Sequence, residues 1–150
     1  VDFTETQRAD MTAEALRVFD MPEAGVLFGE GSRAEAPIAG VLSDLGPGEI
    51  HGFIDRLVVD QSRVLIVDFK TGGAPETPPE GYLRQLAVYR AVLTRLYPDR
   101  RIDAALLWTA APRLQLLDAE DLDAAFGRAA AQERDRRRAS TVLDPIEGAP

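Results

Sequence analysis

The feature that most constrains the fold is a short polar stretch, residues 60–63, between two strongly apolar segments. The flanking segments, 49–59 and 63–70, are rich in Val, Ile, Leu and Phe, which is typical of β-strands. If Gln61 and Ser62 are the two loop residues of a hairpin, residues whose numbers sum to 123 lie opposite each other. That register would place Asp55 opposite Asp68.

Two carboxylates in such positions repel each other, because cross-strand partners have Cβ atoms about 4.5–5.5 Å apart. A divalent cation would offset the repulsion, and Mg²⁺ commonly takes one or two carboxylates together with waters and substrate phosphate. A three-residue loop would shift the register, and the two aspartates would then be ordinary strand-end residues, or Asp55 would pair with Arg56 or Lys70. Both interpretations are open at this point.

Lys70 lies two residues beyond Asp68 and therefore projects from the same face of its strand. It is the only lysine of the chain, whose other 16 basic residues are arginines. An ammonium group beside a metal-bound water can orient that water or stabilise charge on a phosphate. The three side chains together predict a magnesium site at which a bound water could act on a phosphate group.

The remaining pattern predicts a mixed α/β domain, in which helices flank a central sheet. Apolar periodicity, Gly/Pro turns and continuous apolar runs set the expected boundaries. The expected helices are 4–20, 79–96 and 118–138, with a short turn at 22–28. The expected strands are 33–42, 49–59, 63–70, 102–110 and 113–117. We predict one domain over residues 1–138 and a flexible tail over 139–150.

The composition excludes some classes of protein. The chain has 150 residues and no cysteine, which excludes disulfides and a cysteine-ligated iron–sulfur cluster and fits a cytoplasmic location. No apolar run approaches the ~20 residues of a membrane span, and no signal peptide is present. The net charge of −8 is unfavourable for a nucleic-acid-binding protein. The missing initiator Met suggests a fragment of a longer protein.

Four motifs resemble the nuclease domain of RecB-type helicase–nucleases, within the PD-(D/E)XK superfamily. They are segment 52–57 (G-F-I-D-R-L), segment 67–72 (V-D-F-K-T-G), Gln85 followed by Tyr89, and segment 32–38 (S-R-A-E-A-P-I). A D-x-K triplet alone is common, whereas four such motifs in the family's order along the chain are a specific signal. The resemblance implies a restriction-endonuclease-like core with a central mixed β-sheet flanked by helices.

The likeness covers residues 27 to 108, and within the family it is greatest for AddA-type subunits of bacterial repair enzymes. Phe28-Gly29 followed by Ser32 to Glu35 carries that impression. The resemblance implies a nuclease module that resects double-strand breaks for recombination. It implies single-stranded DNA delivered by a helicase, an AddB-type partner subunit, and ATP used only by a helicase part. This chain has no phosphate-binding loop of its own.

The resemblance also implies roles for individual residues. Asp55 and Asp68 would bind Mg²⁺, or Mn²⁺ in its place, with the backbone carbonyl of Phe69. Lys70 would position the attacking water and the scissile phosphate. Three further side chains would serve the same site: Glu35 at the metal, and Gln85 and Tyr89 from one helical face.

Ordinary structural roles are the alternatives for these residues: Glu35 and Gln85 would be surface residues, and Tyr89 would pack in the core. Many relatives carry a metal-binding histidine on an early helix, but His51 does not match that motif. We expect His51 to be a surface or packing residue. The alternative for the whole chain is a catalytically silent module that keeps the fold and guides DNA.

Overall fold

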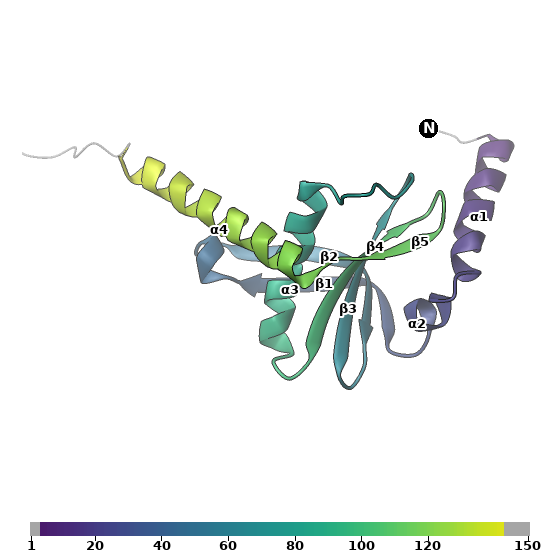
Figure 1. Ribbon diagram of the computed structural model, residues 1–150, viewed down its shortest axis with the longest axis horizontal. Helices are drawn as coiled ribbons and strands as arrows, with labels where there is room; N and C mark the ends of the chain where they lie inside the picture. The colour runs from purple at the N-terminus through teal and green to yellow at the C-terminus, as the bar shows by residue number, and fades with distance from the viewer. Residues whose placement is uncertain (1–3, 143–150) are drawn as a thin grey trace, which may run out of the picture.

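The computed structural model describes residues 4–142 of the chain (Figure 1). Two helices come first in the sequence, then three strands, a helix, two strands and a last helix. The helices are α1 (Glu5–Phe19), α2 (Ala24–Phe28), α3 (Glu80–Leu96) and α4 (Ala119–Val142), with a 3₁₀ turn, η1, at Ser43–Leu45. The strands are β1 (Ser32–Val41), β2 (Glu49–Val59), β3 (Arg63–Lys70), β4 (Arg101–Trp108) and β5 (Arg113–Leu116).

The five strands form one mixed sheet in the order β1-β2-β3-β4-β5. Only β3 and β4 run parallel, because α3 lies between them in the chain and carries the backbone to the other end of the sheet. All other neighbours are antiparallel. This is the α/β architecture, a central mixed sheet flanked by helices, that the sequence predicts.

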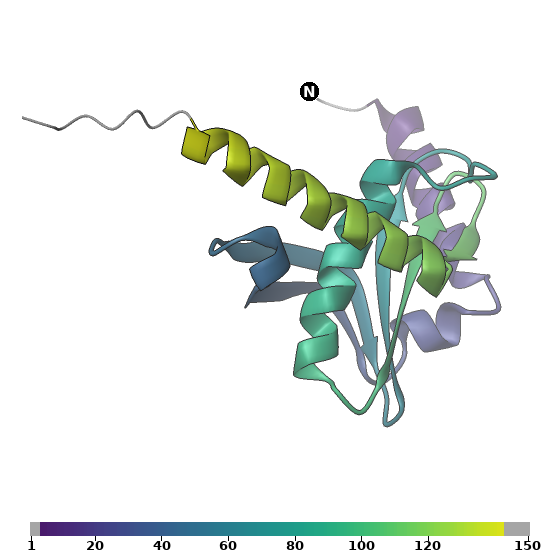
Figure 2. The ribbon, with the colours of Figure 1, turned by 60° about the vertical axis from the view of Figure 1, so that its left-hand side comes forward.

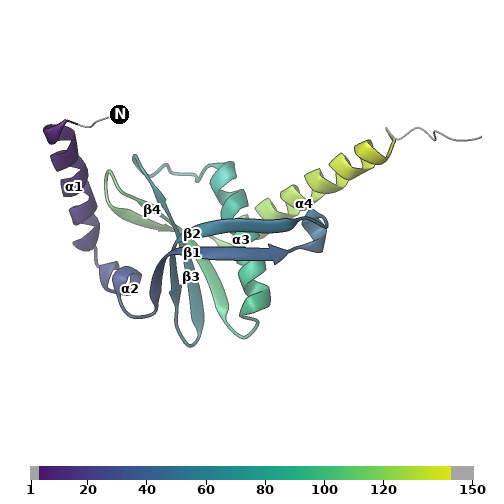
Figure 3. The same ribbon diagram turned by 180° about the vertical axis from the view of Figure 1, so that it is seen from behind.

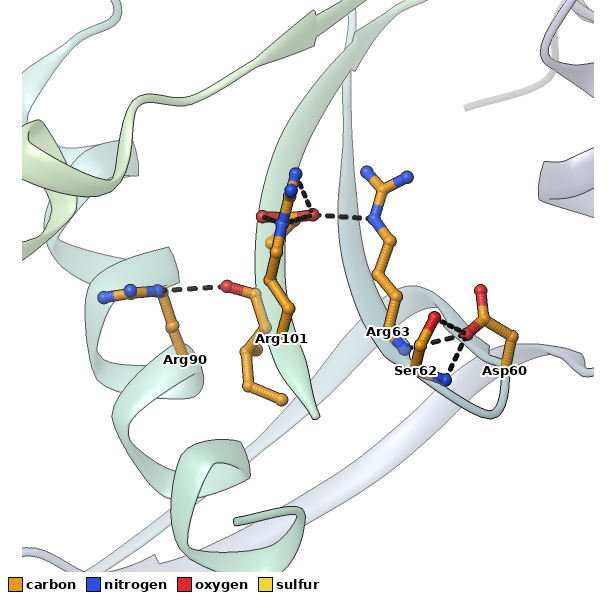
Figure 4. Close-up of polar contacts among 7 residues, drawn as sticks. Asp60, Ser62, Arg63, Arg90 and Arg101 are labelled. Atoms are coloured by element: carbon orange, nitrogen blue, oxygen red, sulfur yellow. Dashed lines mark hydrogen bonds and ion pairs between the residues drawn. The ribbon is translucent and has the colours of Figure 1, made fainter. Parts of the chain in front are cut away.

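The predicted hairpin register is confirmed. The β2–β3 pairs run from Val59 opposite Val64 to Arg56 opposite Val67, and the numbers of each pair sum to 123. Figure 4 shows how the turn is closed: the carboxylate oxygen Oδ1 of Asp60 accepts the backbone N–H groups of Ser62 at 2.8 Å and Arg63 at 2.7 Å. Both hydrogen bonds lower the pKa of Asp60, and the one from Ser62 has the larger effect.

A second polar arrangement joins the first residues of the parallel pair. The carboxylate of Asp103 lies 2.6 Å from Nε of Arg63 on β3 and 2.8 Å from Nη2 of Arg101 on β4. Burial raises the pKa of Asp103, but the Arg101 hydrogen bond and the two guanidinium charges outweigh this effect and lower it. The carboxylate thereby links the starts of two strands that are far apart in the sequence.

The helices cover both faces of the sheet, as Figures 2 and 3 show from two sides. Helices α3 and α4 pack over the larger hydrophobic cluster, which includes Ile66, Leu86 and Leu122. The smaller cluster on the other face includes Val18 and Leu27, from α1 and α2.

Two features of the helices differ from what the sequence suggests. Helix α1 forms where predicted, with Thr4 as its N-cap, but three of the apolar residues that predicted it are more than half exposed: Met11, Leu16 and Phe19. Helix α4 continues to Val142, so the predicted helix end at 138 is too early. The predicted domain boundary at 138 stays a prediction. The arginines at 134–138 consequently do not form its last turn. Residues 143–150 of the predicted tail lie outside the described residues.

No helix in the described part of the chain is both long enough and apolar enough to span a bilayer.

Candidate active site

The candidate site lies where the β2–β3 ladder stops. The next positions in the register after Arg56 and Val67 are Asp55 and Asp68. In place of a backbone pair, the side chain of Asp55 closes the ladder, because its Oδ2 accepts the N–H of Phe69 at 2.7 Å. The regular alternation of β2 is interrupted here, since Ile54 and Leu57 both face the larger cluster. Beyond this point β2 and β3 are no longer paired, and we call the position of the two aspartates the fork.

Asp68 is the one charged residue that is buried among the described residues, with 7 % of its surface exposed. Its Oδ2 lies 2.6 Å from Nζ of Lys70, yet no hydrogen bond of good geometry satisfies this buried oxygen. Burial raises the pKa of Asp68, Lys70 opposes that shift, and the nearby charge of Asp55 adds to it. A buried carboxylate in this state favours a bound cation.

Lys70 has a second partner that the sequence reasoning did not assign to the site. Its Nζ lies 4.1 Å from the centroid of the Tyr82 ring, in the first turn of α3. The Tyr82 ring is in turn tilted against Trp108, with the centroids 6.3 Å apart. Helical spacing offered a signal, because Tyr82 precedes Gln85 by three residues and Tyr89 by seven.

Gln85 and Tyr89 lie on α3 and are half-buried. The hydroxyl group of Tyr89 reaches across to β2 and lies against the backbone of Gly52, where any side chain would collide with it. Gly52 is three residues before Asp55 on the same strand. The Tyr89 ring also packs against the larger hydrophobic cluster, so this residue combines a buried ring with a hydroxyl near the fork. The side chain of Gln85 forms no hydrogen bond with any other described residue.

Two other residues that the sequence analysis considered, Glu35 and His51, are exposed. Glu35 occupies the β1 position that the register sets opposite Asp55, but it is exposed and adopts a positive φ of 47°. A non-glycine residue rarely takes that conformation. His51 is exposed and forms an ion pair with Glu49, 3.0 Å from Nε2 to Oε2, which agrees with the expected surface role.

The oxygen donors at the fork suit a small hard cation. The candidate ligands are the carboxylates of Asp55 and Asp68 and the carbonyl of Phe69, and the unsatisfied Oδ2 of Asp68 is one donor that needs a partner. No group of three or more acidic, His or Cys side chains gathers anywhere within residues 4–142. Magnesium fits such a sparse set, because it keeps several waters and uses only one or two carboxylates.

The comparisons with known proteins identify the class of protein to which this fold belongs. The sequence model of the PD-(D/E)XK nuclease superfamily matches residues 3–147. The chain therefore belongs to the PD-(D/E)XK nuclease superfamily.

One of the similar solved structures shows the same fold. A candidate exonuclease from Eubacterium rectale superposes with a TM-score of 0.68 at 14 % sequence identity, over 95 % of this chain and 59 % of that one. The protein SSO0001 superposes with a TM-score of 0.43 at 12 % identity, over 95 % of this chain and 80 % of that one. The chain thus spans somewhat more than half the length of the Eubacterium rectale protein. No curated protein sequence matches it.

Proposed function

We propose that this chain hydrolyses DNA phosphodiester bonds with Mg²⁺, or Mn²⁺ in its place. The observation that supports this most is the buried, unsatisfied oxygen of Asp68, which lies beside Lys70 and close enough to Asp55 for the two charges to interact. A structural role alone does not account for a buried carboxylate held next to a second one of like charge, because such an arrangement opposes folding.

In the proposed site, Asp55, Asp68 and the Phe69 carbonyl would hold the metal, with Glu35 as a further contributor. The bound ion would polarise the scissile phosphate and lower the pKa of an attacking water. The ammonium of Lys70 orients that water and stabilises the charge that develops on the phosphate. Gln85 and Tyr89 contact the substrate strand from α3.

The biological setting that we propose is the nuclease module of an AddA-type, RecB-like helicase–nuclease, which resects double-strand breaks for recombinational repair in the cytoplasm. Such a module receives single-stranded DNA from an ATP-driven motor and acts beside an AddB-type subunit. The motif order along the sequence supports this setting, and the name of the Eubacterium rectale protein agrees with exonuclease activity. The net charge of −8 fits a domain to which other parts of a complex deliver DNA.

The test is cleavage of single-stranded DNA with and without Mg²⁺, comparing wild type with Asp68→Ala and Lys70→Ala. We expect each substitution to reduce cleavage by roughly 10²–10⁴-fold, the range of lost acid–base or electrostatic catalysis. Asp135→Ala, at an exposed position on α4, is the matched control and should cleave like wild type.

Equal cleavage by all four proteins would refute the site assignment. Absence of metal-dependent cleavage by the wild type, also in the presence of a helicase motor and partner subunit, would refute the nuclease proposal. If DNA binding persisted without cleavage, the chain would be a silent, DNA-guiding module with the same fold.

A further inference from the structure

We propose that Tyr82 is a positioning residue of this site: the face of its ring holds the ammonium of Lys70 in place. The proposal rests on the proposed function, because it concerns the lysine that would act on water and phosphate. Its physical basis is the 4.1 Å distance from Lys70 Nζ to the Tyr82 ring centroid. A cation at this distance from an aromatic face is attracted by the ring quadrupole.

The ammonium of Lys70 needs more than one partner, because only 19 % of the Lys70 side chain is exposed to solvent. An ammonium carries three donors, and a desolvated charge must be compensated by its surroundings. Asp68 attracts the ammonium from one side, with 2.6 Å between Nζ and Oδ2. The Tyr82 ring attracts it from α3. Without the ring, Asp68 would be the dominant attraction, and Lys70 would move with the carboxylate that is to bind the metal.

The ring itself is braced by a chain of contacts that leads away from the site. Trp108 is the register partner of Lys70 across β3 and β4, and Tyr82 is tilted against it. The indole N–H of Trp108 donates to Oε1 of Gln115 at 2.9 Å, and the amide of Gln115 donates to the carbonyl of Pro75 at 3.4 Å. Strand β5 and the loop after β3 therefore help to fix the orientation of the Tyr82 ring.

Placing Tyr82 at the start of α3 gives the ring a fixed height above the sheet. The N–H of Tyr82 donates to the carbonyl of Pro79 at 3.0 Å, in the first turn of the helix. Rigid elements position functional groups better than loops do. A shift of about 1 Å in a reacting group can reduce a rate by roughly 10²-fold. We therefore expect the ring to affect turnover more than binding of DNA.

The decisive substitutions are Tyr82→Phe, which keeps the aromatic face, and Tyr82→Leu, which keeps apolar volume but removes it. Tyr97→Leu is the matched control, because the Tyr97 ring holds Arg100 at 5.2 Å rather than Lys70. Folding of each variant is checked by the fluorescence of Trp108, the only tryptophan of the chain. If Tyr82→Leu does not fold, Tyr82→Met replaces it.

The first measurement needs neither metal nor DNA. Because Lys70 is the only lysine, lysine labelled with ¹³C at Cε gives one signal from the whole protein. The ring current of Tyr82 should shift its ε-methylene protons upfield of their position in the unfolded chain. We expect the shift to persist in Tyr82→Phe and Tyr97→Leu and to disappear in Tyr82→Leu. An unchanged Lys70 signal in Tyr82→Leu would overturn the placement of the lysine on the ring.

The second measurement is steady-state cleavage with Mg²⁺. We expect kcat of Tyr82→Leu to fall by roughly 10–10²-fold with little change in KM, while Tyr82→Phe stays near wild type. Equal loss in Tyr82→Phe and Tyr82→Leu would overturn the proposal in favour of a role for the phenol hydroxyl. A wild type that shows the upfield Lys70 signal but no cleavage, also with a helicase motor and partner subunit present, would refute the nuclease proposal and leave the placement of Lys70 supported.

Discussion

The hydroxyl group of Tyr89 lies against the backbone of Gly52, so α3 approaches β2 more closely here than any other residue type would allow. This contact sits three residues before Asp55 and fixes the distance between the helix and the strand that together line the site. It gives the glycine of the G-F-I-D motif a physical role that does not involve its backbone angles.

Gly52→Ala should therefore displace Tyr89 and destabilise the fold by about 1–3 kcal/mol, the usual effect of overpacking. Urea unfolding followed by Trp108 fluorescence measures this change. Adding Tyr89→Phe removes the hydroxyl oxygen that is nearest to the new methyl group, so the double variant should lose less stability than the two single changes predict together. Strict additivity would show that the two residues do not interact.

Asp55 has a structural role that can be separated from its proposed role as a metal ligand. Asp55→Ala leaves the N–H of Phe69 without its acceptor, which should reduce stability by about 1–3 kcal/mol. Asp55→Asn keeps an oxygen acceptor and should keep most of the stability. Both variants should lose metal-dependent cleavage. Wild-type cleavage by a well-folded Asp55→Asn would show that the charge is not needed.

Asp68 should make the metal-free protein less stable as the pH rises. Its pKa is raised by burial above the ordinary value of 3.8, so the folded state holds the proton more tightly than the unfolded chain. The stability that this provides is complete below the ordinary pKa and is lost as the pH rises through the folded-state pKa. Asp68→Asn should thus be more stable than wild type at pH 7, by about 1 kcal/mol, and no more stable at acid pH.

Thermal unfolding of both proteins over this pH range, with and without Mg²⁺, measures the effect. Because a ligand that binds only the folded state stabilises it, Mg²⁺ should raise the Tm of wild type and leave that of Asp68→Asn unchanged. A lower stability of Asp68→Asn at neutral pH would contradict the inferred penalty of the buried charge.

The turn at Gln61 and Ser62 should show the opposite dependence on pH. The pKa of Asp60 is lowered because its ionised carboxylate accepts two backbone N–H groups. Its contribution is complete above the ordinary pKa and is lost as the pH falls through the folded-state value. Asp60→Ala should lower the Tm at pH 7 and have little effect in strong acid. Asp60→Asn, which keeps an acceptor, is the control and should show a smaller loss.

The hairpin and its register follow from local information, and this is why the sequence predicts that Asp55 and Asp68 meet. A two-residue loop between apolar segments leaves few alternatives, and each step along the ladder then fixes the next. The buried β4 strand is equally local, because both of its faces are apolar from Ala104 to Trp108.

Other features depend on tertiary contacts that periodicity does not contain. The spacing of Met11, Leu16 and Phe19 predicts the helix α1, yet nothing in that spacing says whether another element covers them. In the sequence, Tyr82 resembles an ordinary apolar-face residue of α3. Its contact with Lys70 exists only because the first turn of α3 lies beside the ends of β3 and β4. Glu35, with its positive φ, likewise lies at the fork, where the β1–β2 pairing skips one position and the β2–β3 pairing ends.

The mixed connectivity of the sheet also suggests an order of folding. The β2–β3 hairpin closes over two loop residues, whereas β3 and β4 pair only after a crossover that contains α3. Closing a longer loop loses more entropy, so local hairpins form early and parallel pairs form late. The carboxylates of Asp55 and Asp68 would then come together before Trp108 and Tyr82 enclose Lys70. A divalent cation present at that stage would act as a template for the nascent sheet, in addition to the catalytic part that we propose for it.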